Sequence, residues 1–95
     1  MAVVTISRWA SSDASLAKEL GAVIKKHGAI SVQLGICHAG AYAGQSFWII
    51  VFPDFETYGR AIQGLTADAD YQKIYGELAT KFELQERSII SVEDL

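Results

Sequence analysis

The most apolar stretch of the chain is the six-residue run Phe47-Trp48-Ile49-Ile50-Val51-Phe52, which Pro53 and Asp54 follow. The run is short and rich in β-branched and aromatic residues, and a proline cannot continue a hydrogen-bonded ladder. The pattern therefore predicts a central β-strand. Side chains alternate across a strand. Every second residue of the run, beginning with Phe47, therefore faces one side of the sheet, and the residues between them face the opposite side. Both faces of this strand need to be covered.

Two strands are predicted before this run. Residues 3–9 place Val4 and Ile6 on one face, and residues 30–38 alternate almost perfectly between apolar and polar residues. Between them Leu16, Leu20, Val23, Ile24 and His27 recur at helical spacing. The segment Ser11-Ser12-Asp13 supplies a helix start, in which a serine accepts from the first free N–H groups and Asp13 lies at the positive end of the dipole. Gly28 would end this helix in a left-handed conformation. Residues 39–46, with two glycines, predict a turn that makes a hairpin of the strands on either side.

Two helical patterns and one strand follow the run. Asp54 would cap the first helix, and Gly64 with Thr66-Ala67 would interrupt it. Its buried side is expected at Phe55, Tyr58, Ala61, Ile62 and Leu65. Asp68 and Asp70 suit the first turn of a further, shorter helix. One side of that helix carries Tyr71, Ile74, Tyr75, Leu78 and Phe82.

Residues 84–92 predict the last strand, which completes the order βαββαβ. This order is typical of a ferredoxin-like α+β domain with a four-stranded antiparallel sheet, in which the first and third strands are central. The most apolar segment is the third strand, in agreement with that arrangement.

Length and composition indicate a single domain over residues 1–95, because 95 residues with 51% hydrophobic content supply one core. A chain of this size covers one face of a sheet with helices, so a second copy is expected on the other face. The net charge is −3 and no basic cluster exceeds Lys25-Lys26, which argues against nucleic acid or an anionic membrane as the main partner. With no basic n-region and no run near the ~20 apolar residues of a membrane span, a cytoplasmic protein is expected.

The chain resembles the dimeric α/β-barrel superfamily in the order of its elements and in its third strand, which is apolar on both faces. This superfamily includes the antibiotic-biosynthesis-monooxygenase-like, stress-responsive-barrel-like and polyketide-cyclase-like families. The segment 65–74, with an acid followed by Tyr71-Gln72, is similar to the short helical insert before the last strand of such proteins. The resemblance implies a homodimer whose two sheets pack into a barrel, and a small-molecule pocket between sheet and helices in each subunit.

Enzymes of these families, by the same resemblance, use a histidine or tyrosine, or an Asn-Trp-His set, around a hydrophobic cavity. This chain has no asparagine and no histidine in its first strand, which argues against cyclase and haem-degrading chemistry. His38 is the candidate general base, because it ends the strand over 30–38 on its apolar face. A hydrogen-bonded or solvated structural histidine is the alternative, and His27, in the last turn of its helix, is expected to act as a cap.

Five aromatic residues are candidates for lining a ligand pocket, where they would supply apolar surface and hydroxyl groups: Trp48, Tyr58, Tyr75, Trp9 and Tyr42. The alternative is that these rings fill the core. Cys37 is the only cysteine and has no lysine or arginine beside it in the sequence, so an ordinary thiol is expected. The two histidines make no metal motif, so neither a metal nor a cofactor is expected.

Two functions from different classes remain. The first, which the absence of an assembled acid–base set favours, is a dimer that binds a small apolar ligand or serves as a structural or protein-binding dimer. The second is a cofactor-free monooxygenase- or cyclase-like enzyme that acts on a small aromatic or polyketide-like substrate. An RNA-recognition motif shares the order βαββαβ and an aromatic third strand. It is rejected because the third strand has no basic residue to accompany its aromatic rings.

Overall fold

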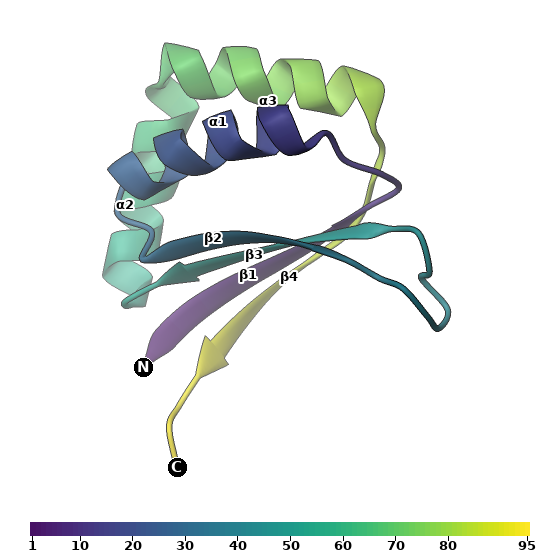
Figure 1. Ribbon diagram of the computed structural model, residues 1–95. Coiled ribbons are helices and arrows are strands. Elements are labelled where there is room, and N and C mark those ends of the chain that lie inside the picture. The colour runs from purple at the N-terminus through teal and green to yellow at the C-terminus, as the bar shows by residue number, and fades with distance from the viewer.

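Four antiparallel strands form one layer and three helices form the other in the computed structural model, which describes residues 1–95 (Figure 1). The elements are β1 (Ala2–Trp9), α1 (Ala14–Lys26), β2 (Ser31–Ile36), β3 (Ser46–Phe52), α2 (Phe55–Ala67), α3 (Ala69–Lys81) and β4 (Leu84–Val92). The sheet order β2-β3-β1-β4 places β1 and β3 in the centre. The ferredoxin-like α+β fold predicted from the sequence is therefore confirmed.

The register of β3 against β1 determines which side chains face the helices. Trp48 lies opposite Ser7, and Phe52 lies opposite Val3; all four are buried beneath the helical layer. The alternate residues of both strands lie on the other side of the sheet, which no element covers (Figure 1). This side is called the open face below. Its central residues are Val4, Ile6 and Arg8 of β1 and Phe47, Ile49 and Val51 of β3, flanked by Ser31, Gln33 and Gly35 of β2 and by Glu86, Ser88, Ile90 and Val92 of β4.

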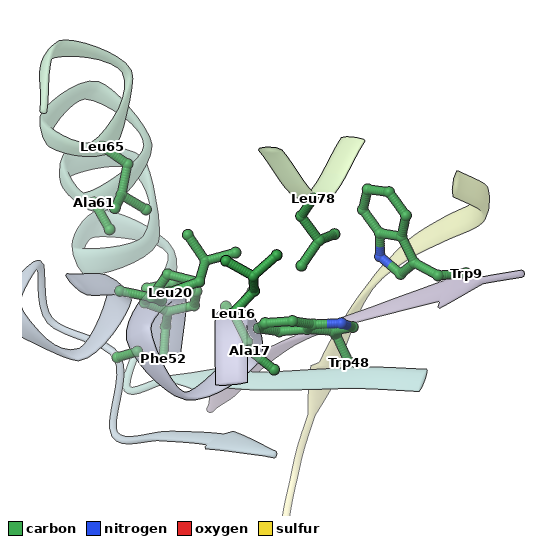
Figure 2. Close-up of a cluster of buried hydrophobic side chains, with 12 residues drawn as sticks. Trp9, Leu16, Ala17, Leu20, Trp48, Phe52, Ala61, Leu65 and Leu78 are labelled. Carbon is green, nitrogen blue, oxygen red and sulfur yellow. The ribbon is translucent and has the colours of Figure 1, made fainter. Parts of the chain in front are cut away.

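The buried core lies between the helices and the other side of the sheet. Twelve buried apolar residues form one cluster, to which all three helices and the two central strands contribute (Figure 2). Trp48 lies at its centre, with Leu16 and Ala17 of α1 on one side and Trp9 on the other (Figure 2). Leu78 is the buried residue of α3 and is 1% exposed. Such continuous burial of apolar area is the main source of stability for a domain of this size.

Side-chain caps fix where the helices begin. The Asp13 carboxylate accepts hydrogen bonds from the backbone N–H groups of Ser15 and Leu16, at 2.9 and 3.2 Å. The predicted serine cap of α1 is therefore wrong, because Asp13 directly precedes the first helical residue and takes both free donors. Asp54 caps α2 as predicted, through a 2.7 Å bond from the Thr57 N–H group. Gly28 follows the end of α1 with a φ of 113°, the left-handed conformation expected of it.

Three predictions about α2 and α3 are wrong. Gly64 does not interrupt α2, which continues to Ala67 and ends at Asp68. The extra helix predicted before the last strand is present as α3, but it is not short, since α2 and α3 are both 13 residues long. Phe55 and Ile62 are 55% and 45% exposed, because α2 lies at one end of the helical layer and buries only the side that carries Ala61 and Leu65 (Figure 1). None of the three helices combines the length and the apolar character that crossing a bilayer requires.

Candidate functional site

A cavity with two adjacent chambers lies between the sheet and the helices. The first chamber has a volume of about 40 Å³ and the second of about 90 Å³. Five residues line both: Ser7, Ile24, Ile50, Tyr71 and Arg87. The rest of the first chamber is formed by Trp9, Leu20, Trp48, Tyr75 and Leu78, and the rest of the second by Thr5, Phe52, Tyr58, Ile62 and Leu65. The walls are mostly apolar with a few polar groups, which is the usual composition of a small-molecule site.

Four of the six residues predicted from the sequence line this cavity. Trp9, Trp48 and Tyr75 belong to the first chamber, and Tyr58 belongs to the second. The Tyr75 ring meets Trp9 edge-on with centroids 6.0 Å apart, and it stacks on Tyr71 at 5.4 Å. Four of the five predicted aromatic residues are thus brought together, from β1, β3, α2 and α3.

Tyr42 lies elsewhere, in the loop between β2 and β3. Its ring covers the guanidinium of Arg8, with the Arg8 carbon 3.9 Å from the ring centroid, and it meets Phe47 edge-on. Both of these residues belong to the open face. Tyr42 therefore supports one end of the open face and does not line the cavity.

His38 also lies outside the cavity. Its prediction rested on a strand over 30–38, but β2 ends at Ile36, and His38 lies exposed in the following loop. The loop folds back through two backbone bonds, from Cys37 N–H to Gln45 O and from Gly44 N–H to Cys37 O. The His38 side chain is in no hydrogen bond or ion pair, so the structure gives it no partner that would orient it as a base.

Sequence reasoning missed the polar residues of the cavity, Ser7 and Arg87. The Nε–H group of Arg87 donates to the Ser7 hydroxyl oxygen at 2.9 Å. These residues lie opposite each other in the β1–β4 register, although they are 80 positions apart in the chain. For Tyr71 the sequence predicted only a position on the apolar side of the helix that follows Asp68. Burial raises the pKa of the Tyr71 phenol, so this hydroxyl stays protonated as a potential donor.

The indole nitrogen of Trp48 has no hydrogen-bond partner although Trp48 is 3% exposed. The nitrogen lies on the edge of the ring that points toward Trp9, the other tryptophan of the first chamber (Figure 2). A buried donor without a partner costs about 1–3 kcal/mol. Such a group is accounted for by a ligand or a water that accepts its hydrogen bond.

A hydrogen-bonded junction holds the start of α3, from which Tyr71 and Tyr75 reach the cavity. His27, the C-cap of α1, lies with its Nε2 atom 2.7 Å from Oδ2 of Asp68. The other Asp68 oxygen accepts from the N–H groups of Asp70 and Tyr71 and so caps α3. The His27 hydrogen bond, together with these N–H groups and Lys26, lowers the pKa of Asp68. The sequence identified His27 as a cap but gave no signal for this link between three helices.

No group of three or more histidine, cysteine, aspartate or glutamate side chains comes close enough together to hold a metal ion. The Cys37 thiol is half-exposed and points at the carbonyl oxygen of Ala39, 3.1 Å away. The chemistry that the cavity offers is therefore hydrogen bonding from Trp48, Ser7, Arg87 and the tyrosine hydroxyls, within aromatic walls.

No protein-family model matches the sequence, and no curated protein matches it either. Solved structures do match over nearly the whole chain. A variant of SnoaB, a cofactor-independent oxygenase from Streptomyces nogalater, is 14% identical, with a TM-score of 0.74, over 99% of this chain and 95% of that one. A NIPSNAP family protein from Agrobacterium tumefaciens is also 14% identical, with a TM-score of 0.69 and the same coverage. An antibiotic biosynthesis monooxygenase is 11% identical, with a TM-score of 0.60, over 98% of each chain.

At these identities the comparison establishes a shared fold and no shared activity. The structural neighbours are antibiotic-biosynthesis-monooxygenase-like and NIPSNAP proteins. The ferredoxin-like fold that the sequence resemblance implied is the fold that these neighbours share.

Proposed function

We propose that this chain forms a homodimer that binds a small apolar or aromatic molecule between its sheet and its helices. One observation carries the proposal: an aromatic cavity at the centre of the fold contains a buried indole N–H group with no partner, on Trp48. A cavity with apolar walls and a convergent polar group is the usual form of a ligand site. Most buried donors in folded proteins are paired with a protein group or an ordered water, so this N–H group is free to bind a ligand in the cavity.

The volume of the cavity limits the ligand. Each chamber is smaller than the ~150 Å³ cavity that holds one benzene ring. The two chambers share Tyr71 and Arg87 as walls, so a shift of these two side chains would join them. The ligand is therefore of about one ring, and larger molecules require the helices to move.

The open face supports the homodimer. Its central strands present Val4, Ile6, Ile49 and Val51 without cover, and on β4 Ile90 and Val92 are 43% and 42% exposed. Four strands at ~4.8 Å spacing and ~3.4 Å per residue give a face of roughly 20 by 25 Å. The loop between β2 and β3 and the end of β4 extend on the same side, away from the helices (Figure 1). The sheet face alone is thus about 500 Å², and the loop and the end of β4 would add to it toward the ~800 Å² per partner of a standard interface.

Fluorescence titration tests the ligand site, because both tryptophans of the chain line the first chamber and report on its contents. We expect saturable changes with benzyl alcohol and benzamide. Trp48→Phe removes the unpaired donor while leaving Trp9 as the reporter, and it should weaken binding about tenfold, the effect of a hydrogen bond worth ~1.4 kcal/mol. Tyr42→Phe is the matched aromatic control outside the cavity and should bind as the wild type. Absence of saturable binding, or an unchanged affinity in Trp48→Phe, contradicts the proposal.

A second candidate function is cofactor-free oxygenation or cyclisation of a small aromatic or polyketide-like substrate. The fold shared with SnoaB, which is described as a cofactor-independent oxygenase, favours it, as does the position of Trp48 in the cavity. Oxygen uptake in the presence of hydroquinone, a one-ring phenol, would reveal such an activity. Catalysis that His38→Ala abolishes would place His38 in the mechanism, whereas full activity of that variant would remove it.

A further inference from the structure

Arg87 differs from the other arginines of the chain in having no acidic partner. The chain has three arginines, and two of them form ion pairs: Arg8 with Glu86 at 3.7 Å and Arg60 with Glu56 at 3.9 Å. Arg87 forms none, and its only side-chain hydrogen bond is the one from Nε–H to Ser7. The two terminal nitrogens of its guanidinium therefore keep their donors free.

Arg87, which carries these free donors, lies in the wall of the cavity. Arg87 is the only charged residue that lines either chamber of the cavity, and it lines both. No aspartate or glutamate shares those walls, so nothing in the cavity balances its charge. Tyr71 does not supply a counter-charge either, because burial raises the pKa of its phenol and keeps it neutral. The cavity is thus an aromatic space with one unbalanced positive charge at its wall.

A guanidinium presents parallel N–H donors that match the two oxygens of a carboxylate, and charge-assisted bonds of this kind are about twice as strong as neutral ones. Ser7 adds to this arrangement. Its oxygen accepts from Arg87 Nε–H, so its own hydroxyl hydrogen remains free to donate to the same ligand oxygen. The rings of Tyr71, Tyr75 and Trp9, which pack against one another in the first chamber, offer the surface for an aromatic ring.

We infer that the ligand is a small aromatic carboxylate, whose acid group pairs with Arg87 and Ser7 while its ring lies among the aromatic side chains of the joined chambers. This inference rests on the proposed ligand site and specifies the chemical class that the site selects. Arg87 lies on β4, an edge strand of the sheet, and it is exposed to solvent. The acid group would therefore sit on the solvent-exposed side of the cavity, where its desolvation is partial.

Benzoate and benzamide test the inference, because they share shape and ring and differ in charge. Calorimetric titration of the wild type should show benzoate binding at least tenfold more tightly than benzamide. Arg87→Met should lower the affinity for benzoate at least tenfold and change that for benzamide less than twofold. Arg60→Met removes the same charge from an exposed position of α2 and should leave both affinities unchanged. Arg87→Lys, which keeps the charge without the planar fork, should give an intermediate affinity for benzoate and covers the case in which Arg87→Met does not fold.

Two results would overturn the inference: equal affinities for benzoate and benzamide in the wild type, or a preference for benzoate that survives in Arg87→Met. Either would leave the proposed ligand site intact, since both compounds would still bind in the cavity. Failure of both compounds to bind would overturn the ligand site and the inference together.

Discussion

Two glycines of α2 provide a matched test of how the helices are joined. An alanine at Gly59 would meet no atom within 4 Å, whereas the Cβ atom of an alanine at Gly64 would lie 2.5 Å from Nδ1 and 2.9 Å from Cε1 of His27. Both glycines are inside the same helix, where alanine is more favourable than glycine by about 0.5–1 kcal/mol. Gly59→Ala should therefore stabilise the protein by about that amount.

Gly64→Ala should not stabilise the protein, because the His27 ring cannot move aside freely. The ring is held by its 2.7 Å contact with Asp68, and inserting a methyl group into such a packed contact costs about 1–3 kcal/mol. The difference between the two variants isolates this cost, since the helix-propensity gain is common to both. A change of 1 kcal/mol shifts the Tm of a domain of 60–100 residues by about 4–8 °C. Gly64→Ala should thus melt at least about 4 °C below Gly59→Ala.

Thermal unfolding followed by circular dichroism, at one protein concentration for all variants, measures this difference. The double variant His27→Ala/Gly64→Ala removes the overlapping ring, so the methyl group at position 64 should cost less there than in the wild-type background. The reasoning is refuted if Gly64→Ala is as stable as Gly59→Ala, or if removing the His27 ring leaves the cost of the methyl group unchanged.

Two further predictions concern the core and the junction at Asp68. Leu78 is 1% exposed and also lines the first chamber, so Leu78→Ala should lower the free energy of unfolding by about 3–5 kcal/mol in urea titrations. Leu95→Ala, at a fully exposed position, should leave the free energy of unfolding unchanged. Equal stability of the two variants would contradict the packing of α3. The pKa of Asp68 is lowered in the folded state, so the stability it contributes is fully present above its ordinary value of 3.8 and is lost as the pH falls through the lower, folded pKa. Asp68→Asn should therefore flatten this part of the dependence of stability on pH, and an unchanged acid transition in that variant would count against the junction.

The order of elements was predictable from the sequence because it depends on local patterns. The apolar run from Phe47 and the strand over 84–92 occur as β3 and β4 with nearly the predicted bounds. Alternation alone also separated Trp48 from Phe47 on opposite faces of the strand, but which face the helices cover follows from the register and packing of the whole sheet. Periodicity of this kind is a property of each segment and needs no knowledge of its neighbours.

The remaining features depend on contacts between distant segments. Gly64 suggested a helix break by its residue type, but the space beside it is filled by the His27 ring from another helix. The end of β2 at Ile36, which moves His38 into a loop, follows from the backbone bonds between Cys37 and Gln45. Arg87 meets Ser7 only because β4 pairs with β1 in one particular register. A pattern within one segment carries no information on such pairings.

The molar mass in solution shows whether a second copy of this chain covers the open face, as proposed above. Ile49 lies in the middle of that face, so Ile49→Lys would place a charge at the centre of the interface. Ile30→Lys is the control, because Ile30 is 62% exposed and lies outside the sheet.

Light scattering coupled to size-exclusion chromatography at micromolar concentration should give twice the 10.3 kDa of one chain for the wild type and for Ile30→Lys. Ile49→Lys should give the mass of one chain or fail to fold. A wild type with the mass of a single chain, or an Ile49→Lys variant that remains a stable dimer, would contradict the account.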